Sequence, residues 1–286
     1  MGPKLKNMIV RAISGALFVA IMVVGIYEPD GVGIGALFCL ITGMSVWEFT
    51  GLVNERAGVT VNRFICTTAG VFLTMAMSAY CSGMTPAVVF IPYLITILYL
   101  LVSELYLKQE DPIHDWAYTM MSQMYVALPF SCIFILGYYQ GAYYYLLPLS
   151  VFIFLWCNDT GAYLSGSLFG KHKLFPRVSP GKSWEGSIGG GILVVAVAAL
   201  VGYLEPTNAE GVALSGLSIP EWMGMGLVVV FFGTWGDLVE SLFKRTLGIK
   251  DSGNVLPGHG GMLDRFDSSL LAIPAVVVYL YTLSVM

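Results

Sequence analysis

The amino-acid sequence predicts an all-α polytopic membrane protein with about nine transmembrane helices. Its 286 residues are 57% hydrophobic and only 11% charged, and the mean hydropathy of +0.77 is far above that of a soluble domain. The apolar runs are close to 20 residues long, enough for a helix rising about 1.5 Å per residue to cross about 30 Å of hydrocarbon. A transmembrane β-barrel would instead show alternating segments of about 10 residues.

Nine apolar segments define the expected spans. They fall at roughly 8–27, 32–53, 64–81, 86–103, 116–138, 143–158, 188–204, 222–240 and 269–286. The first follows Lys4 and Lys6 as in a signal peptide, but no small-x-small cleavage site precedes Glu28, so we interpret it as a membrane helix. The five cysteines lie in or beside apolar runs without Cys-x-x-Cys spacing, which predicts neither a zinc site nor a disulfide framework.

The distribution of basic residues predicts the topology. We place five segments in the cytoplasm: 1–11, 54–63, 104–115, 159–187 and 241–268. All 14 Lys and Arg residues fall in or at the edge of these segments, whereas the opposite side carries only acidic groups. Because positive charge biases a flanking loop to the cytoplasm, we expect the N-terminus inside and the C-terminus on the opposite side. The net charge of −4 argues against a nucleic-acid partner, although the distribution is more informative than the sum.

Polar groups are concentrated in the second half of the chain. We therefore expect residues 1–142 to form scaffold helices and residues 143–286 to carry the functional site, both within one integral-membrane unit. Glu48 is an ionisable exception in the scaffold, near the cytoplasmic end of its span. A charge in a span is a functional hypothesis by default, but this side chain can also simply reach the interface, so no role is assigned to it.

Four polar residues repeat at helical spacing near the end of the eighth span: Asp237, Glu240, Ser241 and Lys244. If the helix continues into the cytoplasm, they share one face over about 10 Å. A solvated helix end with Glu240 paired to Lys244 explains that pair, which is worth only a few tenths of a kcal/mol. It does not explain Asp237, which lies deeper in an apolar run and requires a partner or an ion.

A glycine-rich turn follows, in two parts at 248–253 and 256–261. Glycines allow backbone N–H groups to converge on an anion, so the turn is a candidate phosphate-binding site. Most such turns only connect elements, and this one gains weight from the charges on both sides. His259 lies within the turn, where it either binds a ligand or bonds to the backbone.

The turn leads into Asp264-Arg265-Phe266-Asp267, which offers two carboxylates three residues apart with a guanidinium between them. Carboxylate oxygens suit Mg²⁺, which binds through one or two carboxylates plus substrate phosphates. The alternative is that these charges complement a helix dipole, a role that Asp267 alone could fill.

The other polar loop begins with Asp159, which like Asp237 is a carboxylate at the cytoplasmic mouth of an apolar span. Small residues at 161, 162, 165 and 166 would allow another helix or a ligand to approach closely. Further on, Ser179, Lys182 and Ser183 are phosphate-binding residue types. They do not form a Walker A loop, because Pro176 stands where that motif requires glycine. Basic residues beside a membrane also attract anionic lipid headgroups without catalysis.

Taken together, these motifs resemble those of the CDP-diacylglycerol synthases, or phosphatidate cytidylyltransferases. The family signature reads here without departure as Ser241-Leu-Phe-Lys244-Arg245, Lys250-Asp251 and His259-Gly260-Gly261-Met-Leu-Asp264-Arg265-Phe-Asp267. Asp159-Thr-Gly-Ala-Tyr and Ser179-Pro-Gly-Lys182-Ser183-Trp-Glu185-Gly also look like family motifs. The resemblance covers roughly residues 156–269, and the first 150 residues are only generically similar.

The resemblance implies an enzyme that converts phosphatidate and CTP into CDP-diacylglycerol and pyrophosphate at the membrane. It also implies Mg²⁺, with room for a monovalent ion such as K⁺ in the same site, and a homodimer in the bacterial cytoplasmic membrane with its site on the cytoplasmic face. The expected catalytic residues are Asp237, Lys244, Arg245, Asp264 and Arg265, and the expected metal ligands are Asp237, Asp264 and Asp267. The expected substrate-binding residues are Asp159, Ser179, Lys182, Ser183, Glu185, Ser241, Lys250, Asp251, His259, Gly260 and Gly261.

Two other functions would also use some of these motifs. A CTP-dependent polyprenol or phytol kinase uses similar acidic and basic motifs but moves the γ-phosphoryl group to an alcohol. A transporter would use Asp159, Asp237 and Asp264 as intramembrane ion ligands. The expected topology disfavours the transporter, because the charges lie at one face of the membrane and no pair of broken helices marks two matching halves.

Overall fold

The computed structural model describes residues 3–253 and 260–285, with side chains from residue 12 onward. The described chain is almost entirely helical and forms two compact units. The first unit comprises Met1–Phe134 and Lys244–Phe266, and the second comprises Ile135–Phe243 and Asp267–Met286.

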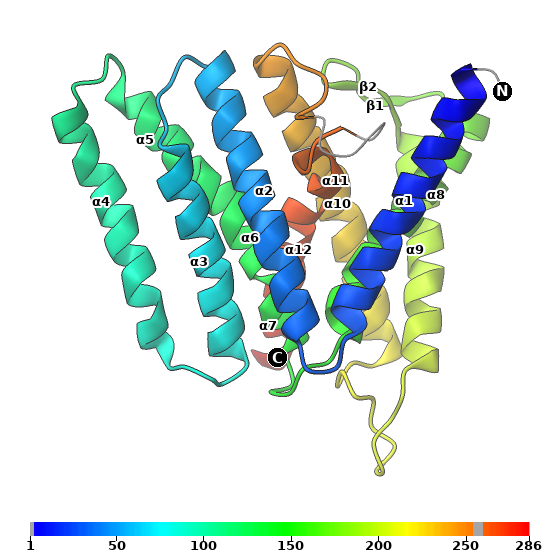
Figure 1. Cartoon of the computed structure of the whole chain (residues 1–286). Coiled ribbons are helices and arrows are strands. Elements are labelled where there is room, and N and C mark those ends of the chain that lie inside the picture. The colour runs from blue at the N-terminus through cyan, green and yellow to red at the C-terminus, as the bar shows by residue number, and fades with distance from the viewer. Residues whose placement is uncertain (1–2, 254–259, 286) are drawn as a thin grey trace. The chain divides into compact units, whose positions relative to one another are not determined.

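The first unit is a helical bundle (Figure 1). Its elements are α1 (Pro3–Tyr27), α2 (Val32–Arg56), α3 (Arg63–Cys81), a 3₁₀ turn (Ala87–Phe90), α4 (Ile91–Leu107), α5 (Pro112–Met121), a π-helical segment (Ser122–Ala127), α6 (Leu128–Ser131) and α11 (Leu263–Phe266). Pro129 lies near the start of α6, just after the π-helical segment. A helix tolerates proline in its first turn, because the N–H that proline lacks would have no partner within the helix there.

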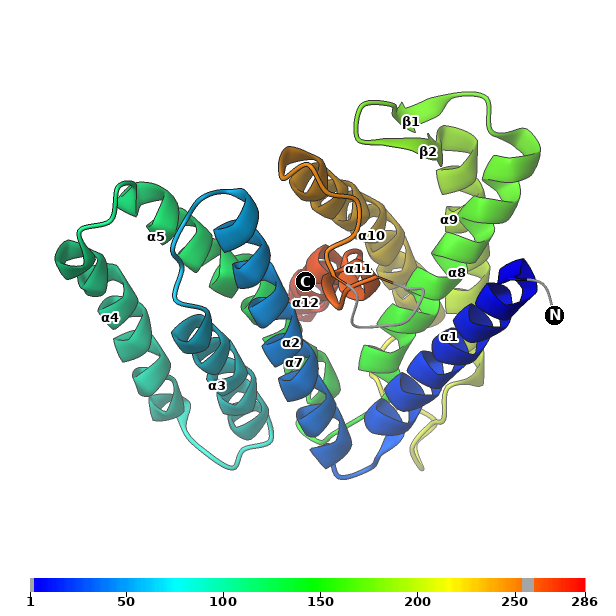
Figure 2. The same ribbon diagram turned by 45° about the horizontal axis from the view of Figure 1, so that its top comes forward.

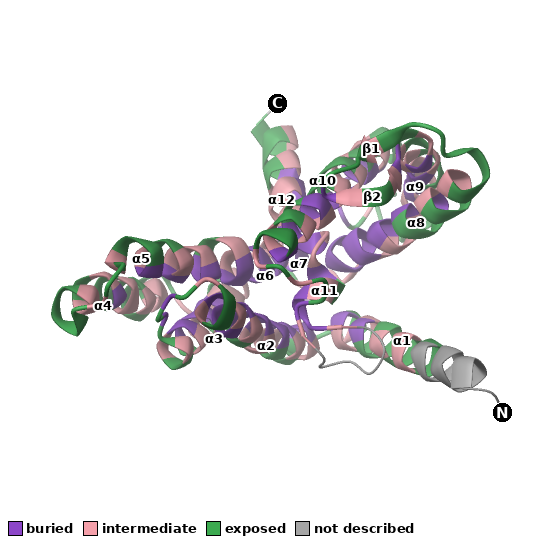
Figure 3. Cartoon of the chain, turned by 90° about the horizontal axis from the view of Figure 1, so that it is seen from above, coloured by how far each residue is buried: buried purple, intermediate pink, exposed green. Residues whose placement is uncertain are grey.

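Helix α2 lies at the core of the first unit. It buries aromatic and branched side chains, including Phe38, Val46 and Phe49. Phe38 packs edge to face against Phe130, with ring centroids 6.2 Å apart. Helix α4 is the opposite case, because Leu100 is its only buried residue although the helix is strongly apolar (Figure 3). An apolar, exposed helix of this kind is expected to face lipid.

The second unit contains the longer polar connections. Its elements are α8 (Leu146–Phe169), β1 (Lys173–Phe175), β2 (Ser179–Ser183), α9 (Trp184–Leu204), α10 (Ile219–Thr246) and α12 (Ser269–Val285). The short α7 (Ile133–Gly137) begins in the first unit, and the end of α10 from Lys244 belongs to the first unit. Strands β1 and β2 form an antiparallel hairpin between α8 and α9 (Figure 2).

Helices α8 and α9 approach each other through glycines. A Cβ added to Gly161 would lie 2.9 Å from the Cα of Gly190, and one added to Gly186 would lie 2.9 Å from the carbonyl oxygen of Ala162. The small residues expected to permit close approach therefore do so, and what approaches is α9.

The connection at the other end of α9 is held by Glu205. Its buried carboxylate accepts hydrogen bonds from the backbone N and Oγ of Ser215 (2.6 and 2.7 Å) and from the indole nitrogen of Trp222 (2.9 Å). A buried carboxylate is tolerated where donors surround it, so Glu205 fixes the start of α10.

The prediction of a predominantly helical chain is confirmed for the described residues, where helices occupy all nine expected segments. Seven helical stretches of this part of the chain are long and apolar enough to cross a membrane. Helix α8 is not among the seven, because Asn158 and Asp159 lower the hydropathy of its middle. The apolar stretch Ala12–Tyr27 of α1 is shorter. The side of the membrane that each connection faces stays a prediction.

Boundaries of α8, α9 and α10 that bear on the site differ from the expectation. Helix α8 continues to Phe169 and α9 begins at Trp184, so the expected loop 159–187 is shorter and Asp159 lies inside a helix. Part of that loop is the β-hairpin, which the all-α prediction did not include. Helix α10 continues to Thr246, which confirms that the eighth span is helical beyond residue 240. Hydropathy marks where a chain becomes polar, not where a helix ends, and packing against α9 keeps the polar part of α8 helical.

Candidate active site

A pocket of about 190 Å³ lies in the second unit, among α8, β2, and the adjoining parts of α9 and α10. It is lined by Asn158, Asp159, Ala162, Tyr163, Gly181, Lys182, Ser183, Gly186, Ser187 and Thr234. Three of the expected substrate-binding residues, Asp159, Lys182 and Ser183, therefore line one pocket.

Asn158 and Thr234 line the same pocket but were not expected there. The Asn158 side chain is only 4% exposed, and its Oδ1 has no hydrogen-bond partner among the described residues. A buried amide oxygen without a donor costs free energy, and this one faces α9, since a Cβ on Gly190 would lie 2.6 Å from it. The available signal was an asparagine next to Asp159 at the end of an apolar run.

Lys182 and Asp237 form an ion pair beside this pocket. The Nζ of Lys182 lies 2.5 Å from Oδ2 of Asp237 and donates to the backbone oxygen of Thr234 at 3.4 Å. Ser241 donates to the other carboxylate oxygen of Asp237 at 3.1 Å. The partner that Asp237 was expected to require is thus a lysine from the hairpin. The side chains of Lys182 and Asp237 are 26% and 28% exposed, so both remain accessible.

The remaining expected residues of the hairpin have structural contacts. Ser183 is the N-cap of α9 and accepts a hydrogen bond from the Gly186 N–H at 3.1 Å. Glu185 accepts from the backbone N–H groups of Lys171 and His172 and lies 2.6 Å from Nδ1 of His172, which ties the base of the hairpin. Ser179 begins β2. Contacts of these residues with substrate stay predictions.

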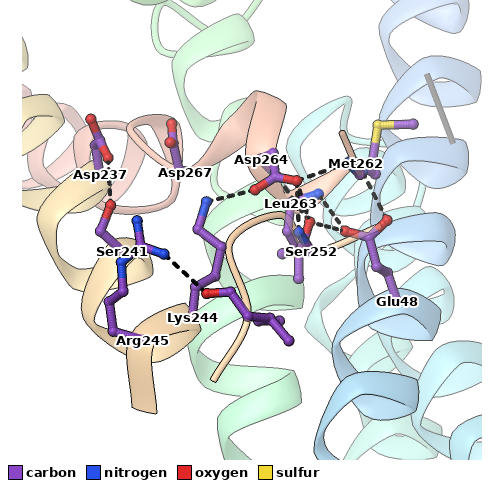
Figure 4. Close-up of polar contacts among 12 residues, drawn as sticks. Glu48, Asp237, Ser241, Lys244, Arg245, Ser252, Met262, Leu263, Asp264 and Asp267 are labelled. Atoms are coloured by element: carbon purple, nitrogen blue, oxygen red, sulfur yellow. Dashed lines mark hydrogen bonds and ion pairs between the residues drawn. The ribbon is translucent and has the colours of Figure 1, made fainter. Parts of the chain in front are cut away.

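Asp264 is the centre of a second cluster, in the first unit (Figure 4). Its Oδ1 lies 2.6 Å from Nζ of Lys244. Its Oδ2 accepts hydrogen bonds from Ser252 N (2.8 Å), Ser252 Oγ (2.9 Å) and Gly261 N (2.8 Å). The side chains of Asp264 and Lys244 are only 6% and 11% exposed. The expected catalytic pair Lys244 and Asp264 is thus brought together.

The cluster around Asp264 leaves no room for a side chain at position 260, which explains the glycine there. Gly260 has φ of +81°, and a Cβ there would lie 2.5 Å from Oδ2 of Asp264. An L side chain is disfavoured on both counts. The turn was expected to converge on an anion, and within the described residues the anion that Gly261 N contacts is Asp264.

Glu48 also reaches this turn, although the sequence had suggested no role for it. Its carboxylate accepts hydrogen bonds from Met262 N (2.9 Å), Leu263 N (3.1 Å) and Ser252 Oγ (Figure 4). The one available signal was a charged residue inside an apolar span.

The other expected residues are more dispersed. Arg245, Lys250, Asp251 and Arg265 are exposed, and Arg245 donates to the Ile249 carbonyl at 3.1 Å. In the second unit, the Asp267 backbone lies against α10 next to Asp237, since a Cβ on Gly236 would lie 2.8 Å from the Asp267 carbonyl oxygen. His259 lies outside the described residues.

The carboxylates differ in how they could hold a divalent ion. No group of three or more His, Cys, Asp and Glu residues gathers in the described part of the chain. Mg²⁺ does not require such a group, because substrate phosphates and waters complete its shell. A carboxylate offers about four acceptor positions. The two contacts of Asp237 described above leave such capacity. Asp264 is more heavily occupied, because Lys244, Ser252 N and Gly261 N contact it and Ser252 Oγ lies within hydrogen-bond distance.

Residues 9–283 match the model of the cytidylyltransferase family. A phosphatidate cytidylyltransferase of Haemophilus influenzae is 33% identical over 246 residues, which cover 81% of this chain and 84% of that protein. Phosphatidate cytidylyltransferases of Staphylococcus aureus and Staphylococcus haemolyticus are each 40% identical over 173 residues, or 60% of this chain. Those matches span 62% of the length of the staphylococcal proteins. The chain belongs to the cytidylyltransferase family.

Proposed function

We propose that this protein converts phosphatidate and CTP into CDP-diacylglycerol and pyrophosphate, and so serves phospholipid biosynthesis. The observation that carries the proposal is the pairing of Lys182 with Asp237 beside a polar pocket in an otherwise apolar helical unit. The names of the relatives from Haemophilus influenzae and Staphylococcus aureus support it.

The proposed reaction needs no protein nucleophile. A phosphate oxygen of phosphatidate, already ionised at neutral pH, attacks the α-phosphorus of CTP. A new P–O bond forms there, the bond to the bridging oxygen of the β-phosphate breaks, and pyrophosphate leaves with that electron pair. The difficulty is to bring two anions together, so positioning and electrostatic stabilisation carry the catalysis.

The basic residues would supply that stabilisation. Lys182 faces the pocket from β2, held by Asp237 and the Thr234 carbonyl. Lys244, Arg245 and Arg265 would neutralise the remaining phosphate charge. That the cluster around Asp264 acts together with the one around Asp237 is part of the proposal and rests on the shared signature motif.

The acidic residues would hold the metal. Asp237, Asp264 and Asp267 are the proposed ligands of Mg²⁺, with a monovalent ion such as K⁺ in the same site. When bound, the metal would neutralise charge on the triphosphate and on the leaving pyrophosphate.

We assign the pocket to the phosphates of CTP rather than to the whole nucleotide. Its volume of about 190 Å³ is below the range of about 300–1,000 Å³ typical of ligand pockets.

The apolar helices would keep the acyl chains of phosphatidate in the bilayer. We further propose that the site opens to the cytoplasm, where CTP is available, and that the protein works as a homodimer. The proposal that the site opens to the cytoplasm rests on the charge distribution, because all Lys and Arg residues lie in or at the edge of the segments predicted to be cytoplasmic.

The direct test is incubation of the purified protein with phosphatidate, labelled CTP and Mg²⁺. We expect label in the lipid phase, pyrophosphate in the aqueous phase, and no product when Mg²⁺ is omitted. Release of CDP with a phosphorylated lipid alcohol would establish a lipid kinase instead. Ion or metabolite flux into proteoliposomes without a lipid product would establish a transporter.

A further inference from the structure

We infer that Glu48 is a positioning residue for the catalytic loop, resting on the function proposed above. The catalytic loop is here the described segments 247–253 and 260–264. Glu48 comes from α2, in the part of the chain expected to be scaffold, and it contacts the loop at both segments (Figure 4).

The first support is the set of donors around its carboxylate. Met262 N donates to Oε2 at 2.9 Å and Leu263 N donates to Oε1 at 3.1 Å. Ser252 Oγ, from the other side of the loop, also donates to Oε1. Hydrogen bonds to an ionised acceptor are about twice as strong as neutral ones, so this carboxylate clamps the two segments together.

The second support is the shape of the loop around Glu48. A Cβ added to Gly253 would lie 2.7 Å from Oε2 of Glu48, and one added to Gly261 would collide with Oε1 and with Ser252 Oγ. Two glycines of the loop therefore leave room for this side chain. Part of the glycine content that suggested a phosphate site is explained by a protein carboxylate.

The third support is the link from Glu48 to Asp264. Ser252 Oγ lies within hydrogen-bond distance of both carboxylates but has only one proton to donate. Ser252 N and Gly261 N are held by Asp264, and the next two N–H groups of the loop are held by Glu48. The orientation of Asp264, and of Lys244 paired with it, thus depends on the same hydrogen-bond network.

Helix α2 is a suitable anchor because its surroundings are rigid. Phe49, next to Glu48, is fully buried, as are Val46 and Val53 on the same helix. Phe266 at the end of α11 packs against Phe130 with ring centroids 5.4 Å apart. Side chains fixed by packing define positions more closely than surface loops do.

The experiment compares Glu48→Gln with the matched control Glu55→Gln, which changes an exposed glutamate two turns further along the same helix. Glutamine keeps the size but replaces one acceptor oxygen by a donor, so at least one loop N–H loses its partner. We expect kcat per folded molecule to fall about 10–100-fold, as for other residues that orient metal-site ligands. KM for CTP and phosphatidate should stay within about threefold, and Glu55→Gln should match the wild type.

A second variant tests the network itself. Ser252→Ala removes the hydroxyl between the two carboxylates and should also lower kcat. If both side chains act through one network, the double variant loses less than the product of the single losses. A loss equal to that product would overturn the inference. So would a Glu48→Gln protein that unfolds at lower temperature yet keeps wild-type kcat per folded molecule.

Hydrogen exchange separates this inference from the proposed function. The Met262 and Leu263 amides should exchange faster in Glu48→Gln than in the wild type, and unchanged exchange would contradict the anchoring. If the wild type makes no CDP-diacylglycerol, the proposed function fails, and the exchange result alone then decides whether Glu48 holds the loop.

Discussion

At the scale of single residues, each of the two central carboxylates is paired with a lysine. Asp237 contacts Lys182 in the second unit, and Asp264 contacts Lys244 in the first. An isolated charge near an apolar segment is costly, so each pair stabilises the carboxylate without any ligand. Under the proposed function, each lysine would bind substrate phosphate and each carboxylate would bind the metal.

Asp237→Asn should abolish formation of CDP-diacylglycerol while the protein stays folded in the membrane. The amide is nearly isosteric but carries no charge, so the proposed metal would lose a ligand and several kcal/mol of charge stabilisation. The measurement is lipid-phase label per folded molecule, with Glu221→Gln at the other end of α10 as the control. Asp264→Asn should behave in the same way, and full activity in either variant would remove that residue from the metal site.

Lys182→Ala should lower kcat/KM for CTP by about 100-fold or more, because a cation near the phosphates is lost. Its effect on stability should be small, since a part-exposed ion pair contributes about 0–1 kcal/mol. Steady-state kinetics and a thermal melt in detergent measure the two effects. Lys173→Ala, at an exposed position of the same hairpin, is the matched control and should leave both unchanged. A variant of Lys182 with normal kinetics would exclude this residue from CTP binding.

At the scale of elements, the contact between α8 and α9 builds the pocket. Both helices are apolar, and small residues allow their backbones to approach where Asn158 and Asp159 face the pocket. The same contact keeps α8 helical through a stretch that looked like a loop by hydropathy. Pocket shape and helix packing are therefore coupled in this unit.

Gly190→Ala tests this coupling. A Cβ at position 190 would lie 2.6 Å from Oδ1 and 2.8 Å from the backbone oxygen of Asn158, so the helices must separate. Overpacking of this kind costs about 1–3 kcal/mol, which should lower Tm and weaken CTP binding together. Gly191→Ala is the control, because its Cβ would meet its nearest neighbour at an ordinary 3.6 Å and alanine favours helix. Equal melting temperatures for the two variants would contradict the close contact.

At the scale of the whole molecule, the charge distribution predicts which side of the membrane each connection faces. In a cysteine-free variant, Glu210→Cys should react with an impermeant maleimide added to intact cells. Arg177→Cys should react only after the membrane is permeabilised, because the hairpin is expected on the cytoplasmic side. The measurement is the amount of maleimide bound to each cysteine variant in intact and in permeabilised cells. The reverse pattern would invert the proposed topology.

Much of this protein follows from local sequence patterns. Hydropathy and run length predicted helix in all nine segments where the described chain is helical, and seven of these are long and apolar enough to cross a membrane. The reason is that a membrane helix satisfies its own backbone and must be apolar along its length. Motif spacing predicts a chemical role for Asp237, Lys244 and Asp264, and the structure brings Lys244 and Asp264 together. Helix ends were less predictable, as α8 and α10 show, because polar residues can remain helical where a neighbour packs against them.

The tertiary structure decided which groups meet. Lys182 and Asp237 are 55 positions apart in the chain, and Glu48 and Ser252 are separated by 204. Such pairs depend on how helices pack, and no periodicity in the sequence reports that. The sequence by itself therefore determined the membrane character, the helical segments and the residues able to do chemistry. Only the folded chain showed that Glu48 of α2 contacts Ser252, Met262 and Leu263, because a carboxylate in an apolar span must find its hydrogen-bond donors on another element.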